Sequence, residues 1–352
     1  MTKIASTHQT PLDDASTRFA LLELDDAPLA AIEWDNAQAT SEDIPVIEAV
    51  DDLYKGRFQG HENLDQVRER IPELVATVEK VPLYTADGAV MPGAFGTVRH
   101  MPNGTVQGLG VVGERYHVIQ DFEAFKVMEP LMERGIIGTL TAGVYKAKSW
   151  LYGEAGAFKA DIVPGDTIES RVLIGNSHDG SIPWTMGFPG NRVVCQNTFH
   201  HALSNALSKL MRIRHTKNAS EVVQQVISAV DMFGMEFIES ADKMRMLVKV
   251  PCTEETLKEY TGYVFSQWAT SDEDEENTRT SRVYNKVLEN FESGQGAQYS
   301  RGTLWGAYNS ITEYVSHQRS RSENPNQVFS DNNWGSGALV LKRALDGALA
   351  ML

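Results

Sequence analysis

The stretch that decides the fold is VPGDTIESRVLIGNSHDGSIPWTMGF, residues 163–188. VPGD and SHDGS are rich in the residues that form tight turns. Between them TIESRVLIGN alternates, with Ile168, Val172 and Ile174 on one face and charged residues on the other, which is typical of a strand. Strands joined by turns this short pair antiparallel, because parallel pairs need a long crossover. The stretch therefore predicts an antiparallel sheet.

N-terminal to this stretch, the sequence predicts a mixed region of helices and strands. Residues 64–80 have the pattern of one or two short helices, broken near Pro72. Strand-like runs lie on either side of Gly113 and Glu114. Asp121 caps an expected helix that Gly135 ends, and strands are expected over 138–155.

C-terminal to this stretch, the pattern becomes helical. A long apolar seam with spacings of three and four predicts a helix over 219–249, which Pro251 ends. Further helices are expected over 197–211, 278–292, 303–319 and 337–350. The predicted fold class is α+β: an antiparallel β-rich core, β-β-α and then several strands, followed by long helices.

The distribution of charged residues indicates the domain boundaries more clearly than the distribution of apolar residues does. The formal net charge is -15, and residues 1–52 hold twelve Asp or Glu against Lys3 and Arg18. We therefore expect an acidic N-terminal arm over 1–60, an α+β core domain over 61–270, an acidic connector over 271–277 (SDEDEEN) and a helical region over 278–352. Without the arm, the chain is close to neutral.

The composition also excludes some classes of protein. The sequence has no apolar run long enough to cross a membrane, and its N-terminus has no apolar stretch typical of a secretory signal. Its two cysteines, Cys195 and Cys252, form no CxxC motif, which favours a reducing compartment. We expect a protein of the host-cell cytoplasm with no membrane partner and no cofactor.

The first candidate binding feature is KLMRIRHTK, residues 209–217, which concentrates positive charge in an acidic protein. We expect it to join two helices. Arginine and lysine side chains beside a helix N-terminus are suited to bind phosphate. The alternative is that these cations pair with acidic residues of the protein itself. The residues concerned are Lys209, Arg212, Arg214, His215 and Lys217.

The second candidate is VYKAKSWLY, residues 144–152. If it is one unbroken strand, Lys146, Lys148, Trp150 and Tyr152 share a face. Cations interleaved with aromatic rings are typical of a platform for single-stranded nucleic acid, since cations meet phosphates and rings stack on bases. The alternative is a half-buried face whose rings join the core.

Other patterns are weaker. Cys195, His200, His201 and His215 are close in sequence, but their spacing matches no standard zinc site and nothing indicates an oxyanion hole. GLGVVG at 108–113 resembles a nucleotide loop, yet a strand rather than a helix is expected after it. NSHDGS at 176–181 is more simply a hairpin turn than a metal site.

Several motifs occur in the order found in one known family. They are YHVIQDFEAF (116–125), NSHDGSIPW (176–184), RVVCQNTFHHAL (192–203), IRHTKN (213–218), TLWGAYNSITEYVSH (303–317) and WGSGALVLKRAL (334–345). From about residue 95 to the C-terminus the chain resembles the phage/plasmid-like proteins that bear the domain of unknown function 932. This resemblance implies an origin in a mobile element but no activity. A weaker resemblance of architecture is to phage single-strand annealing proteins, which hold single-stranded DNA in a basic groove.

The sequence thus favours a non-enzymatic protein that binds single-stranded DNA and promotes annealing or recombination as a homo-oligomer. Trp150 and Tyr152 would stack on bases, and the helix over 219–249 would help subunits associate. The residues expected at phosphates are Lys146, Lys148, Arg192, Lys209, Arg212, Arg214 and Lys217. The alternatives are an anti-defence or host-takeover protein whose acidic arm mimics DNA, and a metal-dependent enzyme that uses cysteine and histidine.

Overall fold

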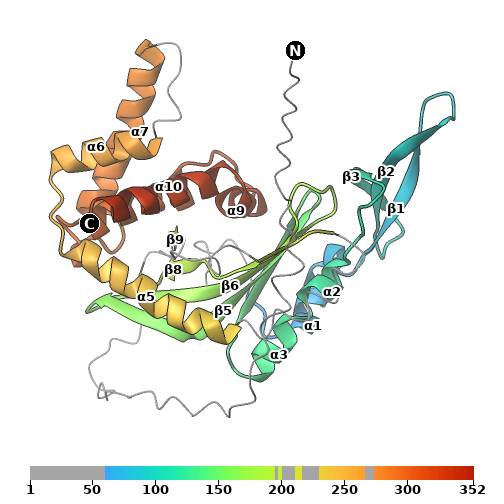
Figure 1. The fold of residues 1–352 in the computed structure, drawn as a ribbon, viewed down its shortest axis with the longest axis horizontal. Helices are drawn as coiled ribbons and strands as arrows, with labels where there is room; N and C mark the ends of the chain where they lie inside the picture. Colours follow the sequence, from blue (N-terminus) through green and yellow to red (C-terminus); the bar gives the residue numbers. More distant parts are fainter. Residues whose placement is uncertain (1–59, 195–196, 200–210, 216–229, 266–272) are drawn as a thin grey trace, which may run out of the picture. The chain divides into compact units, whose positions relative to one another are not determined.

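The computed structural model describes residues 60–194, 197–199, 211–215, 230–265 and 273–352. Within these ranges antiparallel strands come first and most of the helices follow, as the ribbon in Figure 1 shows. The predicted α+β class is therefore confirmed.

A three-stranded antiparallel sheet follows two short helical turns. Its strand order is β1-β2-β3. The bounds of these elements are α1 Leu64–Arg70, a 3-10 turn Pro72–Leu74, β1 Thr77–Tyr84, β2 Val90–His100 and β3 Val106–Gly113. The helix expected over 64–80 is thus wrong for its last residues, which start β1 instead.

A larger antiparallel sheet carries most of the remaining strands. Its seven strands have the order β10-β7-β6-β5-β4, with β8 paired to β6 and β9. The bounds are β4 Leu140–Tyr145, β5 Lys148–Val163, β6 Asp166–Ser177, β7 Trp184–Gly187, β8 Gly190–Arg192, β9 Asn197–Phe199 and β10 Met211–Ile213. The turn predicted at VPGD joins β5 to β6 as expected, with Gly165 at φ 83°.

Two short helices, α2 Asp121–Phe125 and α3 Met128–Glu133, precede this sheet. Asp121 lies inside α2 rather than at its cap, which is Gln120. Their apolar side chains enter a core with strand residues such as Leu151, Val172 and Trp184. The sheet therefore has one face packed against these helices.

The predicted helix over 197–211 is wrong in its described parts. Residues 197–199 form β9, and residues 211–213 lie in β10. β10 is held by its pairing with β7, where Arg212 lies opposite Thr185. Pairing with β7, which lies earlier in the chain, thus determines the conformation of residues 211–213, although their local sequence pattern favours a helix.

The C-terminal part of the chain is helical, as predicted. Its elements are α5 Val230–Val248, α6 Glu254–Phe265, α7 Glu273–Ser293, a 3-10 turn Ala297–Tyr299, α8 Leu304–Glu313, a π-helical turn Tyr314–Gln318, α9 Pro325–Trp334 and α10 Ser336–Ala350. Thr303 caps α8 by accepting a hydrogen bond from the Gly306 N–H. Residues 273–277 of the expected connector belong to α7.

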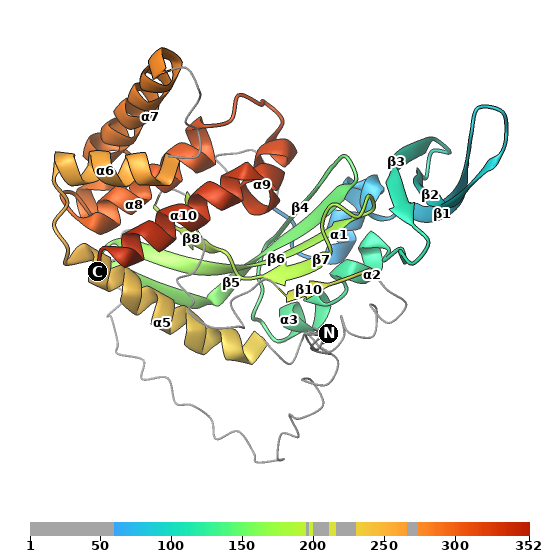
Figure 2. The same ribbon diagram turned by 45° about the horizontal axis from the view of Figure 1, so that its top comes forward.

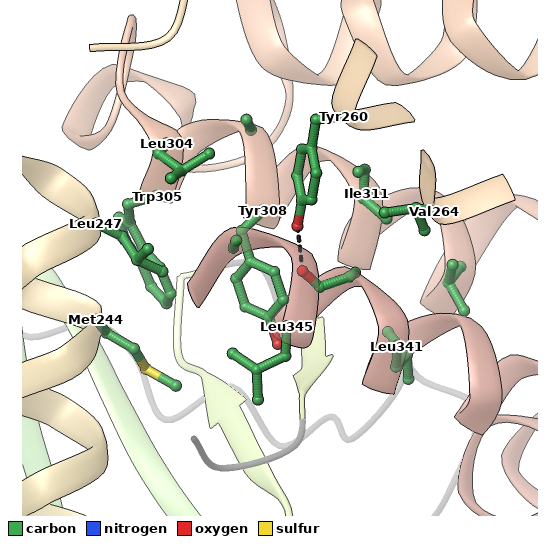
Figure 3. Packing of buried hydrophobic residues seen from close by; sticks show 14 of the residues in the cluster. Met244, Leu247, Tyr260, Val264, Leu304, Trp305, Tyr308, Ile311, Leu341 and Leu345 are labelled. Carbon is green, nitrogen blue, oxygen red and sulfur yellow. Dashed lines mark hydrogen bonds between the residues drawn. The ribbon is translucent and has the colours of Figure 1, made fainter. Parts of the chain in front are cut away.

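The apolar seam of α5 packs within the chain. Phe237, Ala241, Met244 and Leu247 are buried in one cluster with residues of the other helices and of the sheet, and Figure 2 shows α5 alongside β5. Figure 3 shows Met244 and Leu247 beside the helices, where the Tyr260 hydroxyl donates to a backbone carbonyl. The described part of the seam is therefore not free to join subunits. Ile238 and Met246 on the same helix are exposed, so association of subunits through this helix stays a prediction.

No helix in the described ranges is long and apolar enough to cross a membrane.

Candidate functional site

A pocket of about 530 Å³ lies beside the turn that follows β6. Two chain segments form part of its wall, and each contributes an arginine followed directly by a ring: Arg115 and Tyr116 from the first, Arg214 and His215 from the second. Among the described residues, Gly180, Ile182 and Pro183 also line the pocket. Cations, rings and apolar surface therefore meet in one place.

The two segments are joined to each other through their rings and backbones. Tyr116 and His215 stack, with ring centroids 4.8 Å apart and planes 12° from parallel. The His117 N–H donates to the His215 carbonyl oxygen over 3.0 Å, and His215 Nδ1 lies 3.2 Å from the His117 carbonyl oxygen. The Tyr116 hydroxyl donates to the Ser177 carbonyl oxygen over 2.7 Å. These contacts hold the ring pair in a fixed position.

The three-stranded sheet supports the first of these segments. Lys80 Nζ on β1 donates to the carbonyl oxygens of Glu114 and Tyr116, over 2.7 and 2.9 Å. The same ammonium group lies 4.7 Å from the centre of the Phe95 ring. Arg115 is thus carried on a loop that β1 and β2 hold in place.

Both arginines of the pocket are exposed. Across the described ranges, neither Arg115 nor Arg214 makes an ion pair or a side-chain hydrogen bond. An exposed guanidinium group without a partner keeps its five N–H donors available for an anion. The pocket therefore offers two cationic groups to a ligand.

A buried polar cluster lies beneath the pocket around Asp121. One carboxylate oxygen of Asp121 accepts hydrogen bonds from the Ser149 hydroxyl, from Asn176 Nδ2 over 2.7 Å and from His178 Nε2 over 2.9 Å. Arg99 Nη2 lies 3.6 Å from the other oxygen. All five side chains are buried, and β2, α2, β5 and β6 contribute to the cluster.

Opposing effects set the pKa values in this cluster. Burial raises the pKa of Asp121, but the charge of His178, hydrogen bonds from His178 and Ser149 and the charge of Arg99 outweigh it and lower that pKa. Burial lowers the pKa of Arg99, and the charges of Asp121 and Glu73 only partly offset this. Asp121 is therefore an anion, which fits its role as an acceptor.

The cluster and the pocket are electrostatically connected through His215. Burial lowers the pKa of His215 to about 4, and the charge of His178 adds to this effect. The hydrogen bond to the His117 carbonyl oxygen and the charge of Asp121 act in the opposite direction. The ring of His215 is therefore neutral near pH 7. Because a carbonyl oxygen only accepts, the proton of this ring is on Nδ1.

Several buried atoms of this region make no hydrogen bond within the described ranges. They are Arg99 Nε and Nη2, His178 Nδ1 and His215 Nε2, together with the second oxygen of Asp121. Unpaired buried polar atoms are rare in native proteins and often mark sites that do more than stabilise the fold.

The predicted stacking residues lie elsewhere and are buried. Trp150 and Tyr152 are 0% and 1% exposed. Phe329 of α9 stacks on Trp150, with ring centroids 3.9 Å apart, and meets the edge of Tyr152. Neither ring can stack on a base in this structure, so the predicted platform is wrong and the alternative of a core face holds.

The stretch VYKAKSWLY is also not one strand. Tyr145 pairs with Lys148, which makes Lys146 and Ala147 the turn between β4 and β5. Lys146 has φ 56° and is exposed, whereas Lys148 begins β5 and is half-buried. Because the turn reverses the chain, Lys146 does not share a strand face with the aromatic residues, whereas Lys148 lies in β5 on the same face as Trp150 and Tyr152.

Arg192 is not available for phosphate. It is 1% exposed and forms a bidentate ion pair with Asp166, in which Nε and Nη2 lie 2.6 and 2.7 Å from the carboxylate oxygens. A buried arginine paired in this way is part of the protein interior. The prediction that it contacts a ligand is therefore wrong.

The basic stretch 209–217 is described only in part. Lys209 and Lys217 lie outside the described residues, and so does the side chain of Arg212. Arg214 is exposed at the pocket as predicted, whereas His215 is only 7% exposed. The arm over 1–59 and its predicted mimicry of DNA also lie outside the described ranges.

The weaker alternatives gain no support. No group of three or more potential metal ligands occurs in the described residues, and Cys195, His200 and His201 are not among them. GLGVVG belongs to β3, and the strand predicted after it at 114–120 is instead the loop that carries Arg115. The resemblance to a glycine-rich nucleotide loop therefore has no structural counterpart.

Sequence reasoning missed Arg115, Tyr116 and the Asp121 cluster. One signal was present: in RYH (115–117) and RH (214–215), an arginine precedes a ring in both segments. Nothing in the sequence indicated that these segments meet, since almost a hundred residues separate them.

The comparisons with known proteins identify a family and no more. A family model described as a domain of unknown function, DUF932, matches residues 108–334, well over half of the chain. No curated protein and no solved structure matches the chain. The matched range includes both segments of the pocket, with Asp121 and His178 beneath them.

Proposed function

We propose a function for this chain, which belongs to the DUF932 family: it binds single-stranded nucleic acid at the pocket formed by Arg115, Tyr116, Arg214 and His215. The observation that carries the proposal is the convergence of two arginine–ring pairs from distant segments on one pocket. Arginine binds phosphate in a bidentate manner, and the half-buried Tyr116 ring offers a face for a base, while the buried His215 ring supports it by stacking.

Charge and size both favour this class of ligand. The protein is acidic overall, at -15, yet the pocket presents two exposed cations that lack an ion pair in the described ranges. A volume of about 530 Å³ lies within the usual range of small-ligand pockets and suits one nucleotide unit. A neutral ligand would leave both guanidinium groups without a counter-charge.

Finer parts of the proposal rest on the sequence alone: the mobile-element origin on the family resemblance, and the rest on the weaker resemblance of architecture to phage single-strand annealing proteins. We include in it that the ligand is DNA, that the protein promotes annealing or recombination for a phage or plasmid, and that it acts as a homo-oligomer. The buried seam of α5 gives no support to the oligomer. Mass photometry with and without DNA tests the oligomer independently of the pocket.

The test is the salt dependence of binding by the double variant Arg115→Ala/Arg214→Ala. Each lost phosphate contact lowers the slope of log K against log salt by about 0.7 to 0.9, so we expect the slope to fall by about 1.5. Fluorescence anisotropy with a labelled oligonucleotide at several KCl concentrations measures it.

A matched control removes the same charge elsewhere. Arg282 and Arg321 are exposed and do not line the pocket. We expect Arg282→Ala/Arg321→Ala to retain the slope of the unmodified protein. Equal slopes for both double variants would overturn the assignment of the pocket.

A further inference from the structure

The inner face of the three-stranded sheet is attached to the rest of the molecule. The Thr97 hydroxyl on β2 donates to the His178 carbonyl oxygen over 2.5 Å, and Arg99, two residues further along the same face, is buried. Gly110 of β3 pairs with Thr97, and a Cβ atom at Gly110 would lie 2.5 Å from Cβ of Asp179. This face is therefore covered by the turn that follows β6.

The outer face of the same sheet is apolar. A sheet with one face in water ordinarily carries polar side chains on that face. Here strand pairing and alternation place five apolar residues on it, and none of them belongs to a core cluster of the described residues. Two of the five, on β3, are 60% and 63% exposed. Such a patch indicates an interaction surface. Its residues are Val81, Leu83, Val98, Val106 and Val111.

Both edges of the sheet are protected against the addition of a further strand. On β1, the Gln120 side chain exchanges two hydrogen bonds with the Val78 backbone, each over 2.9 Å, and Pro82 has no N–H to donate. On β3, a register shift leaves Leu109 as an extra residue, and such a bulge twists an edge away from a partner. The outer face, rather than an edge, is therefore the surface suited to a partner.

The charge of the sheet favours a second copy of this chain as that partner. Residues 77–113 contain two acidic side chains, Glu79 and Asp87, and two basic ones, Lys80 and Arg99. The sheet thus has a formal net charge of zero in a chain of -15. Two copies of this acidic protein therefore repel each other least where their sheets meet.

The same charges disfavour an anionic partner, such as nucleic acid or the acidic N-terminal arm. An anionic partner requires cations, but Lys80 and Arg99 lie on the inner face. At one end of the outer face, His100 Nε2 lies 3.4 Å from a carboxylate oxygen of Glu79. The outer face therefore offers apolar contact rather than positive charge.

We propose that the outer face packs against the same face of a second copy, related to the first by a two-fold axis. Such an interface is self-complementary, because each copy contributes the same apolar residues. This inference rests on the homo-oligomer included in the proposed function and names its interface. Three strands of this length cover about 400 Å². A standard interface buries about 800 Å² per partner, so we expect a weak dimer that forms at micromolar concentrations.

The experiment compares two double variants by sedimentation velocity at rising micromolar concentrations. Val106→Lys/Val111→Lys should raise the Kd of the dimer at least about hundredfold, because an unpaired charge is costly to bury. Ile238→Lys/Met246→Lys changes two exposed residues of α5 and should keep the Kd of the unmodified protein. Each variant adds two lysines and changes the net charge from -15 to -13, so both reduce the general repulsion equally. All four positions are exposed, so the variants should fold, and circular dichroism checks this.

The outcomes separate this inference from the proposed function. A dimer that is equally stable in Val106→Lys/Val111→Lys, or that only the α5 variant dissociates, would overturn the inference and leave a homo-oligomer standing. An unmodified protein that stays monomeric at every concentration would overturn both. If chymotrypsin then cuts the sheet variant faster within residues 1–52, the acidic arm occupies the face. Binding of single-stranded DNA is measured separately, so a dimer without DNA binding would leave the interface standing while the proposed function fails.

Discussion

Two buried aspartates, Asp166 and Asp121, each lie beside a buried arginine, yet their surroundings differ. Asp166 accepts two hydrogen bonds from Arg192 and one from the Trp305 indole over 2.8 Å. Arg192 also donates to the Gly296 carbonyl oxygen over 2.9 Å. Around Asp121, by contrast, the nearest nitrogen of the arginine lies 3.6 Å away and several atoms are unpaired in the described ranges.

The difference indicates that the two clusters have different roles. The Asp166 cluster joins β6 to α8 and the turn before it, so it connects the large sheet to the C-terminal helices. The Asp121 cluster lies under the pocket, where its charge acts on His215. A saturated network stabilises the fold, whereas unpaired polar atoms cost about 1 to 3 kcal/mol each and persist where function requires them.

The largest effect expected from this comparison is the loss of stability in Asp166→Asn. The substitution leaves the Arg192 guanidinium buried without a counter-charge and removes one of its acceptors. Breaking a buried pair on one side costs about 3 to 5 kcal/mol. Urea unfolding followed by tryptophan fluorescence measures the loss.

Asp121→Asn is the matched control for that variant. Its three hydrogen bonds all reach one oxygen, which an asparagine retains, and Arg99 is not hydrogen-bonded to the other. The variant removes the counter-charge of the buried Arg99 but breaks no hydrogen bond to it, so we expect a smaller loss than for Asp166→Asn. An equal or larger loss of unfolding free energy in Asp121→Asn would show that both clusters stabilise the fold in the same way.

The second-largest expected effect is a dependence of the free energy of unfolding on pH, which arises from His215 in the pocket. The pKa of His215 is about 4 in the folded protein and ordinarily 6.5, so the unfolded state binds more protons between these values. The contribution of His215 is therefore fully present above pH 6.5 and is lost as the pH falls toward 4. It amounts to at most about 3 kcal/mol.

His215→Gln isolates this contribution from the titration of other groups. The difference in unfolding free energy between the unmodified protein and the variant should shrink as the pH is lowered from 6.5 to 4. Chemical unfolding in buffers of constant ionic strength measures both proteins. A difference that stays constant over this window would mean that His215 is not buried as a neutral ring.

Much of the fold was predictable from local patterns. The VPGD turn and the alternation of Ile168, Val172 and Ile174 gave the antiparallel strands, and apolar periodicity gave the helices near 303–319 and 337–350. The strands at 197–199 and 211–213 were missed because pairing with distant strands, not local pattern, determines them.

The site was less predictable, because it depends on contacts between distant residues. Trp150 and Tyr152 have the spacing of a binding platform, but Phe329, far along the chain, covers them. The local concentration of charge in the sequence identifies Arg214. Arg115 is identified only by the structure, in which its neighbour Tyr116 stacks on His215. A basic stretch can be identified from sequence, but its ring partner across the fold cannot.

The smallest effect concerns the hairpin turns beside the two clusters. The turn before Asp166 has Gly165 at φ 83°, a conformation that glycine adopts without strain. The turn beside the Asp121 cluster has Lys146 at φ 56°, and the next residue, Ala147, accepts a hydrogen bond from the His178 N–H over 2.9 Å. The left-handed conformation costs an L-residue about 1 to 2 kcal/mol.

Lys146→Gly should therefore stabilise the protein by about 0.5 to 1 kcal/mol, since the greater freedom of glycine in the unfolded state offsets part of the gain. Lys146→Ala removes the same charge but keeps the strained conformation, so it should give no such gain. If Lys146 contacts phosphate as the sequence predicts, both variants should lower the salt slope of binding by about 0.7 to 0.9. Stabilisation by glycine with an unchanged slope would mean that Lys146 lowers the stability of this turn without contributing to binding.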